Sequence, residues 1–325
     1  MGYITRRLAY SLFTLLTVSI LSFSFLELAP GEFVDDMRVD PTVAPETIEE
    51  LRRQYGLTES LPVRYFRWLR GAAGGDFGYS FAYHTPVSSL IWDRARNTLL
   101  LTVPALAIGW LIALPIGIWT ASRPGGWTDR ASDAGTSALL TVPDVLLALL
   151  LLLLALRTGW FPTGGMTSPG AADLNLFGRA KDVAAHAFLP LMALVVSTLP
   201  LILRHVRASL IEALEAPAIQ AARGHGIPRV RLLYRYALPM ASNPLLSLAG
   251  LSIASLLSAS FLIEVVMSWP GLGPLLLDAI MARDLYLIVA ASLFSTLFLV
   301  FGNLAADLAL FAVDPRIRPG QGARA

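Results

Sequence analysis

The sequence contains no cysteine, and that absence removes several kinds of site at once. Disulfide bonds, thiolate metal sites and cysteine nucleophiles are excluded. Lysine is almost as rare, because Lys181 is the only one and alanine precedes it. A P-loop requires a Gly-Lys pair, so the chain has no ATP-binding motif of that kind, and it also lacks H-E-x-x-H and G-x-S-x-G. These absences argue against an enzyme.

Charge of either sign is also scarce. Charged residues make up 15% of the 325 residues, hydrophobic residues make up 55%, and the mean hydropathy is +0.62. Ordinary soluble domains carry about 25% charged residues, so a membrane is the expected surrounding. The formal net charge of +2 is too small, and the basic residues are too scattered, for a nucleic-acid partner. Membrane lipid is therefore an expected partner and nucleic acid is not.

Long apolar runs are what the sequence has in abundance. A window of about 20 apolar residues, which crosses roughly 30 Å of hydrocarbon, predicts a series of spans. The first follows Arg6 and Arg7, is long for a signal peptide and lacks an A-x-A site before Pro30, which favours a retained anchor. The six predicted spans centre on residues 8–28, 97–120, 135–156, 186–207, 240–264 and 286–312.

The predicted fold is an all-α membrane protein with six transmembrane helices and a small helical extracytoplasmic domain between the first and second spans. The expected boundaries are 1–29 for the N-terminal tail and first span, 30–95 for the extracytoplasmic cap, 96–312 for a five-helix core containing the loop 209–238, and 313–325 for the C-terminal tail.

The distribution of basic residues predicts the orientation. The termini and short connections on one side hold thirteen Lys and Arg residues, and the two short connections on the other side hold four. Because basic residues are retained in the cytoplasm, both termini and the loop 209–238 are expected there.

The segment between the first two spans reads as soluble and helical. In PETIEELRRQYG, Ile48, Leu51 and Tyr55 recur on one face. In PVRYFRWLRG, we expect Val63, Phe66 and Leu69 to lie together on one side of a second short helix. No metal or nucleophile constellation is present, and His84 stands alone, as an ordinary surface residue would.

Two features inside the spans bear on mechanism. Four spans contain or begin with proline, which indicates either a moving, kinked bundle or only the usual frequency of proline in membrane helices. In the fifth span Ser247, Gly250, Ala254 and Ser258 are spaced for close helix packing.

A third feature of the spans is Asp144, a charged residue within an apolar stretch. Asp144 lies about ten residues into the third predicted span, or roughly 15 Å deep, where a carboxylate is costly. It either accepts hydrogen bonds where Pro143 disrupts the backbone, or it lines a translocation path.

A basic, glycine-rich stretch, QAARGHGIPRVRLLYRYALP at residues 220–239, separates two apolar spans. Pro217 can begin a short helix whose Ala218, Ala221 and Ala222 form a face with little bulk, and Gly224 or Gly226 can end it in a left-handed cap. Pro228 can begin a second helix, with the apolar span following Pro239. The first helix can lie close against a partner; alternatively, this is an interfacial helix whose arginines meet anionic headgroups.

These residues resemble the cytoplasmic signature of the membrane subunits of binding-protein-dependent ABC importers. That signature is E-A-A, three residues, G, nine residues, and I-x-L-P. Here Gln220, Ala221 and Ala222 are followed by Gly226 and then by Leu238-Pro239, with Gln in place of Glu and Tyr in place of Ile. The resemblance implies a coupling helix that docks in a groove of a separate ATP-hydrolysing subunit. The ATPase-coupling residues it implies are Gln220, Ala221, Ala222, Arg223, Gly226 and Pro239.

Further stretches are similar to the dipeptide and oligopeptide permease branch of that family: LRRQYGLTESLPVRYFRWL, GDFGYS, FLIEVVMSWPGLG at residues 261–273 and DPRIR at residues 314–318. The resemblance implies half of a pore for short peptides in the bacterial cytoplasmic (inner) membrane. It also implies a homologous second permease, two nucleotide-binding subunits that hold ATP and Mg²⁺, and an extracytoplasmic substrate-binding protein. No cofactor is expected in this chain.

Other functions stay open at this point. Similar subunits import nickel chelates, glutathione or opines, although four dispersed histidines give no metal cluster. A stand-alone secondary transporter would be expected to show repeated halves and buried charge pairs.

Overall fold

The structure is a computed structural model that describes residues 3–28, 46, 49 and 59–313. The helix predicted within residues 45–56 lies outside these residues except for Glu46 and Glu49. The chain divides into two compact units, which are described separately. Unit 1 comprises Tyr3–Thr98 and Pro270–Phe298, and unit 2 comprises Leu99–Trp269 and the residues from Leu299 onward.

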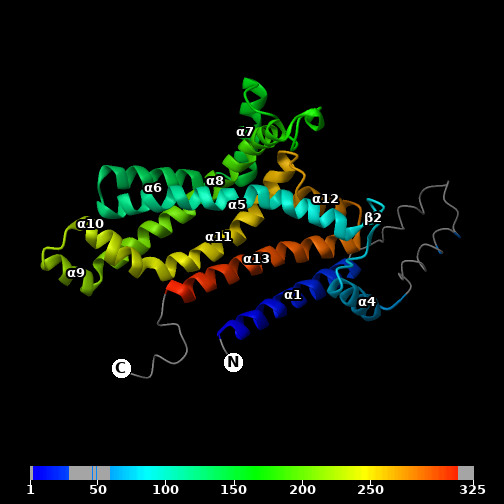
Figure 1. Cartoon of the computed structure of the whole chain (residues 1–325), viewed down its shortest axis with the longest axis horizontal. Coiled ribbons are helices and arrows are strands. Elements are labelled where there is room, and N and C mark those ends of the chain that lie inside the picture. The colour runs from blue at the N-terminus through cyan, green and yellow to red at the C-terminus, as the bar shows by residue number, and fades with distance from the viewer. Residues whose placement is uncertain (1–2, 29–45, 47–48, 50–58, 314–325) are drawn as a thin grey trace. The chain divides into compact units, whose positions relative to one another are not determined.

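The predicted all-α class is confirmed, since the elements of the described residues are helices apart from one pair of two-residue strands. Five helices are long and apolar enough to cross a membrane, and a bent helix pair makes a sixth candidate span. Leucine-rich and alanine-rich runs form helices in hydrocarbon because a helix satisfies its own backbone groups. The elements are α1 (Tyr3–Leu28), α4 (Leu61–Ala73), β1 (Tyr79–Ser80), β2 (Thr85–Pro86), α5 (Val87–Ser122), α6 (Trp127–Leu140), α7 (Asp144–Thr158), a 3₁₀ turn (Ala171–Asp173), α8 (Leu176–Glu215), α9 (Pro217–Gly224), α10 (Arg229–Leu232), a π-helical turn (Leu233–Ala237), α11 (Leu238–Val266), α12 (Leu272–Met281) and α13 (Leu285–Val313) (Figure 1).

The third predicted span, residues 135–156, is wrong as a continuous helix. The structure has α6 and α7 there, bent by 94° at the break between Leu140 and Asp144. Pro143 explains the break, because proline disfavours helical backbone at the preceding residue and has no N–H to donate. The prolines inside continuous helices are Pro104, Pro115, Pro190, Pro200 and Pro244.

In unit 1, α4 packs against α1 through two aromatic side chains. Tyr65 and Trp68 are buried, and the centres of their rings lie 5.6 and 5.9 Å from the ring centre of Phe23 in α1. Val63 and Phe66, two of the three residues expected together on one side of this helix, are 49% and 66% exposed. The large aromatic rings prevail because their polar atoms also find partners. The Tyr65 hydroxyl lies 2.9 Å from the Ser19 hydroxyl, and Trp68 Nε1 donates to the Phe77 carbonyl at 3.1 Å.

The connection from α4 to α5 is fixed by carboxylates from the α12–α13 region of unit 1. Asp284 is fully buried and accepts hydrogen bonds from Ser80 Oγ at 2.7 Å and from the Ala82 backbone N–H at 3.1 Å. Asp278 accepts a hydrogen bond from the Tyr83 hydroxyl at 2.7 Å. Burial, followed by this hydrogen bond, raises the pKa of Tyr83 to about 12.

In unit 2, α8 packs against α6, α7 and α11. Its buried side chains fall into two groups. One group includes Val206 and Leu210 of α8 together with Ile219 of α9. The other includes Leu194 of α8 together with Trp269. The first group anchors α9 to the helix bundle, which fixes the position of the segment between α8 and α11.

Close packing between α11 and α13 occurs at one residue of the predicted small face. A Cβ atom on Gly250 would lie 2.8 Å from Asn303 Oδ1, and one on Gly302 would lie 2.5 Å from Ile253 Cδ1. The two helices can approach this closely only because both positions lack a side chain. Ser247 and Ser258 of the predicted face are exposed instead.

Candidate functional site

The segment that joins α8 to α11 is a short helix with a left-handed end. Pro217 is in the first turn of α9, as expected. Gly226, rather than Gly224, adopts the left-handed conformation, with φ of +76°. Its N–H donates to the Arg223 carbonyl at 3.0 Å, and the Ile227 N–H donates to the Ala222 carbonyl at 3.4 Å. Both α9 and α10 lie together at one end of α8 and α11 (Figure 1).

The two faces of α9 differ in burial. Ala218 and Ala221 are exposed, whereas Ile219 is 4% exposed and belongs to the core. Ala222 is partly buried against the same core, so it is less accessible than the other two alanines of the predicted small face. A helix has one inward stripe, and Ala222 lies on it beside Ile219 because residues three apart share a face. The exposed small residues are therefore Ala218 and Ala221.

Gln220 and Pro239 lie at the two ends of the predicted signature. The Gln220 side chain is exposed, and its amide donates to the Leu214 carbonyl at 2.8 Å. The candidate membrane span runs from Arg229 to Val266 through the exposed Pro239, so it begins before Pro239 rather than after it, as the sequence had indicated. The π-helical turn Leu233–Ala237 directly precedes α11, and Pro239 lies in the first turn of α11. The altered hydrogen-bond pattern of the π-helical turn accommodates a proline there, which has no N–H to donate.

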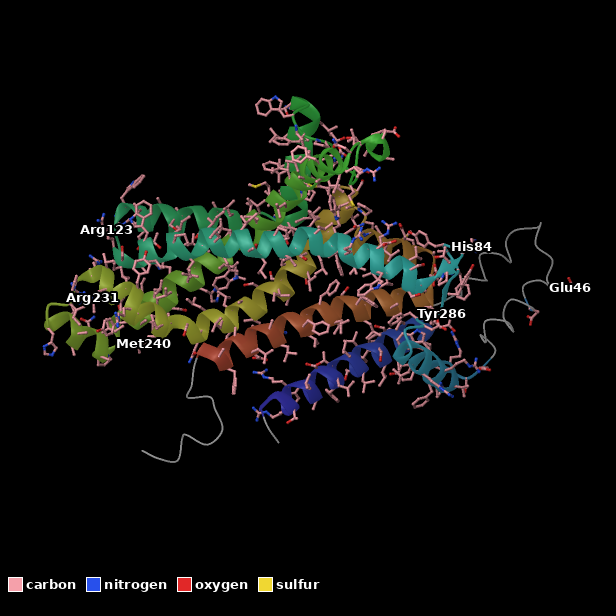
Figure 2. All side chains as sticks on the ribbon, viewed as in Figure 1. Glu46, His84, Arg123, Arg231, Met240 and Tyr286 are labelled. Atoms are coloured by element: carbon pink, nitrogen blue, oxygen red, sulfur yellow. The ribbon has the colours of Figure 1, made fainter. Side chains whose placement is uncertain are left out.

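The arginines of this segment project away from the core. Arg223, Arg229, Arg231 and Arg235 are all exposed, and none forms an ion pair with another residue of the described ranges. Figure 2 labels Arg231 at this end of the molecule, together with Arg123 and Met240 of the same unit. Four unpaired cations beside a small-faced helix make a basic surface suited to a partner.

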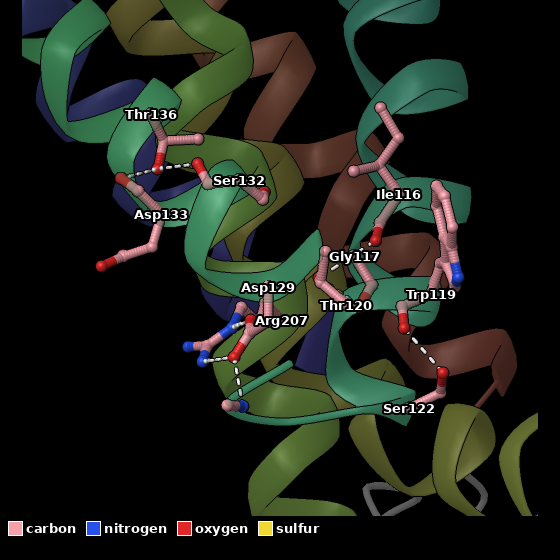
Figure 3. Close-up of polar contacts among 11 residues, drawn as sticks. Ile116, Gly117, Trp119, Thr120, Ser122, Asp129, Ser132, Asp133, Thr136 and Arg207 are labelled. Carbon is pink, nitrogen blue, oxygen red and sulfur yellow. Dashed lines mark hydrogen bonds and ion pairs between the residues drawn. The ribbon is translucent and has the colours of Figure 1, made fainter. Parts of the chain in front are cut away.

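A nearby arginine, by contrast, is paired with a buried carboxylate. Arg207 of α8 forms a two-armed hydrogen bond with Asp129 of α6, which is 3% exposed (Figure 3). The second arm measures 2.8 Å, and the Gly125 N–H donates to the same carboxylate at 2.8 Å. The pair joins the start of α6 to α8. Sequence reasoning counted Arg207 only as a basic residue and did not single out Asp129, although a carboxylate near the end of an apolar span was a usable signal.

Asp144 lies at the first position of α7, not in the middle of a continuous span. The helix bends by 94° just before it, so a depth counted along one continuous helix does not apply to Asp144. Asp144 is half-buried and accepts a hydrogen bond from the Ser197 hydroxyl of α8. The predicted coupling residues lie elsewhere: Gln220, Ala221, Ala222 and Arg223 on α9, Gly226 between α9 and α10, and Pro239 on α11.

Sequence reasoning also missed Glu264 of α11, which is fully buried. It appeared only within the stretch FLIEVVMSWPGLG, where a charged residue inside an apolar span was the available signal. Its carbonyl accepts a hydrogen bond from the Trp269 N–H at 2.8 Å. Across the described ranges, no cluster of three His, Cys, Asp or Glu side chains could hold a metal ion.

Comparison with protein families identifies the family of this chain. Residues 113–319 match the binding-protein-dependent transport system inner membrane component, and residues 1–102 match the N-terminal region of binding-protein-dependent transport system membrane components. The chain belongs to this family of inner membrane components. It is a multi-pass permease subunit of a binding-protein-dependent ABC importer and is not itself an ATPase. Such a system implies ATPase and binding-protein partners.

Relatives of this inner membrane component cover nearly its whole length. It is 34% identical over 318 residues to the oligopeptide transport system permease protein AppB of Bacillus subtilis (strain 168), covering 97% of this chain and 99% of the relative. It is 34% identical over 320 residues to a putative peptide permease protein of Brucella ovis, covering 97% and 98%. It is 30% identical over 321 residues to the glutathione transport system permease protein GsiC of Escherichia coli (strain K12), covering 98% and 99%. These matches place it in the peptide and glutathione group of permeases.

A solved structure shares the fold. The MetNI methionine ABC transporter in an inward-facing conformation matches with a TM-score of 0.54 and 20% identity, over 69% of this chain and 96% of that chain. At this identity the likeness concerns the fold alone.

Proposed function

We propose that this permease subunit forms half of the translocation pathway for short peptides and couples it to separate ATPase subunits through α9. The observation that carries the coupling role is the geometry of α9. Ala218 and Ala221 are exposed, the helix ends at a left-handed Gly226, and a Cβ atom at Gly226 would meet nothing within 4 Å. A narrow, rigid, unoccupied helix face of this kind can lie close to the surface of another protein.

The full assembly follows from this role. One homologous permease would complete the pathway, two ATPase subunits would bind ATP and Mg²⁺ and contact α9, and a substrate-binding protein would deliver the substrate from outside. Both chain termini and residues 209–238 would then be cytoplasmic. The arginines exposed on the α9 segment support this orientation, because basic residues are retained on that side of the membrane.

The proposed substrate is a short peptide, as in the names of two of the relatives. A second candidate is glutathione, which the similarity to GsiC favours. Both are small amides with free carboxylate and ammonium groups. Asp144 is the residue we propose for the translocation path, since it is half-buried at the broken helix and could meet a substrate ammonium group beside Ser197.

The coupling role is tested by measuring substrate-stimulated ATP hydrolysis of the reconstituted complex. Gly226→Val forces a β-branched residue into φ of +76°, at a strain of about 1 to 3 kcal/mol, and should abolish stimulation. Gly125→Val is the matched control, because Gly125 has φ of +74° and equally open space but lies outside the α9 segment. Full stimulation in Gly226→Val, or an equal loss in both variants, would remove the docking role of α9.

A further inference from the structure

The two helices of the bent pair, α6 and α7, are attached to α8 in different ways. In α7, Ala148 and Ala155 pack in the apolar group that includes Leu194 of α8. In α6 the buried residues are Asp129 and Thr136, and no residue of α6 belongs to either of the two apolar groups described for unit 2. Apolar packing therefore positions α7, and other contacts must position α6.

Two carboxylates bond this bent segment to α8. Asp129, in the first turn of α6, binds Arg207 through both carboxylate oxygens. Asp144, which follows the break after α6, accepts a hydrogen bond from the Ser197 hydroxyl. Within the described residues, Asp129 and Arg207 are the only side chains that hydrogen-bond between α6 and α8. The α6 helix thus extends between two bonded points on α8.

Pro200 lies on α8 between these two points. Ser197 and Arg207 are ten residues, or about 15 Å, apart along the helix. Proline has no N–H, so the Val196 carbonyl lacks the hydrogen bond that residue 200 would otherwise donate, and helices commonly bend at such a position. The structure nevertheless has α8 as one helix of 40 residues. The segment that contains α6 therefore spans the point where α8 is most easily bent.

The ion pair at the start of α6 is well suited to resist such a bend. The side chains of Asp129 and Arg207 are 4% and 30% exposed, so water screens their charges only in part. Two parallel N–H···O bonds between a guanidinium and a carboxylate fix direction as well as distance. Because α6 is a helix of fixed length, α8 cannot bend at Pro200 without straining a bond at one end of α6.

The part of α8 beyond Pro200 carries α9. Val206 and Leu210, on either side of Arg207, pack with Ile219 of α9. A displacement of α9 is therefore transmitted to this end of α8. A bend at the proline would absorb the displacement, whereas a helix that is held against bending carries it further along α8.

We propose that α6 is a brace across Pro200, in which Asp129 and Arg207 are positioning residues that keep α8 from bending at the proline. The brace rests on the two bonded points and on the proline between them. Its consequence is that a displacement of α9 reaches the part of α8 that contacts Asp144. That consequence rests on the proposed coupling role of α9.

The first test measures the distance across Pro200 in the full chain assembled with its ATPase subunits. The chain has no cysteine, so spin labels can be placed on Met192→Cys and Ala208→Cys, two exposed positions of α8 about 24 Å apart along the helix. We expect a narrow distribution of distances with the native pair and a broader one in Asp129→Asn, which removes the charge of the carboxylate. Equal widths would overturn the brace.

The second test asks whether the proline is what the pair counteracts. Asp129→Asn should lower the amount of substrate imported per ATP hydrolysed about fivefold, as loss of a typical coupling between sites would. Pro200→Ala restores the missing helical N–H, so adding it to Asp129→Asn should recover most of the wild-type ratio and the narrow distribution. A pair that only stabilises the fold would gain nothing from this second change, and failure to recover would overturn the proposal.

The matched control is Asp133→Asn. Asp133 is exposed, lies one turn after Asp129 in α6, and its side chain forms no hydrogen bond or ion pair within the described residues. Its variant should match the wild type in both tests, and a loss equal to that of Asp129→Asn would overturn the role of the pair. Normal substrate-stimulated hydrolysis in Gly226→Val, with a broadened distribution in Asp129→Asn, would contradict the coupling role of α9 and support the brace.

Discussion

Two connections contain a left-handed glycine but differ in how they contact the rest of the chain. They are residues 74–86 in unit 1 and residues 216–228 in unit 2. Both turn through a left-handed glycine, Gly78 with φ of +93° and Gly226 with φ of +76°. The first connection is bonded through Ser80 and Ala82 to a buried carboxylate about 200 positions away in the chain, since the separations are 204 and 202 residues. In the second, the one arginine, Arg223, is exposed and forms no ion pair with another residue of the described ranges.

The environments of the two glycines explain what the difference means. A Cβ atom on Gly78 would lie 3.0 Å from Cγ of Tyr286, so that glycine is required by packing within unit 1. A Cβ atom on Gly226 would meet nothing within 4 Å, so within the chain only its backbone angle requires glycine. A connection with a fixed backbone and exposed side chains has surface available for a partner, whereas a connection bonded to its own chain is a structural element.

The largest effect on stability should come from Asp284, whose carboxylate holds the connection of residues 74–86 through hydrogen bonds. This connection is called the bonded connection below. Asp284→Ala leaves Ser80 Oγ and the Ala82 N–H without their buried acceptor, and we expect the free energy of unfolding to fall by about 3 kcal/mol. Denaturant unfolding in detergent micelles measures this loss. Asp278→Ala is the control, because Asp278 is exposed and its carboxylate accepts a hydrogen bond from the Tyr83 hydroxyl. An equal loss of stability in both variants would show that the buried carboxylate has no special role.

The pair of Asp129 and Arg207 should give the next largest effect. Asp129→Ala removes a 3% exposed carboxylate from Arg207 and the Gly125 N–H, and we expect a loss of about 2 kcal/mol in the free energy of unfolding. Arg207→Ala combined with Asp129→Ala completes a double-mutant cycle. A coupling energy of about 1 to 2 kcal/mol is expected. Additive single effects would mean that the pair contributes no stability.

A third change separates structure from transport at the broken helix. Asp144→Asn keeps the shape and the contact with Ser197 but removes the charge, so we expect normal assembly with a KM for peptide about tenfold higher, equivalent to 1.4 kcal/mol. Uptake assays in proteoliposomes over a range of peptide concentrations measure this. Asp144→Leu, which removes both charge and hydrogen bonding, should also lower the protein yield. An unchanged KM and substrate range in Asp144→Asn would assign Asp144 to structure alone.

The smallest effect concerns pH in the bonded connection. Burial and the bond to Asp278 raise the pKa of Tyr83 to about 12, whereas an unfolded tyrosine ionises near pH 10. The stabilisation is therefore present below about pH 10 and is lost as the pH rises through about 12. The difference in phenolate absorbance between the wild type and Tyr83→Phe reports this ionisation. A midpoint near pH 10 would contradict it.

The parts of the fold that were predictable depend on local sequence. Apolar runs of about 20 residues identify spans because hydrocarbon leaves the backbone no alternative to a helix. Pro217 likewise marks the start of α9, and Gly226 marks the left-handed turn that follows its end, since each residue type suits one backbone conformation. The expected domain boundaries and the coupling residues themselves stay predictions.

The features that the sequence did not predict have a common physical cause. Packing between segments that are distant in the chain determines which side chains are buried and where helices bend. On α4, Phe23 of α1 determines that Tyr65 and Trp68 are buried, which the apolar spacing of Val63 and Phe66 does not indicate. On α9, the neighbouring core rather than the size of its side chain orients Ala222. At Pro143 the sequence signalled a disruption, but the 94° bend depends on the helices that α6 and α7 pack against.

Cross-linking from α9 tests the proposed docking most directly. The chain has no cysteine, so a single cysteine at Ala221, on the exposed face of α9, can carry a short photoactivatable cross-linker. Ser89→Cys, at an exposed position in the first turn of α5, is the control. In the assembled complex we expect the Ala221 position to cross-link to an ATPase subunit and the Ser89 position not to do so. Cross-linking of an ATPase subunit from Ser89, with none from Ala221, would contradict the docking of α9.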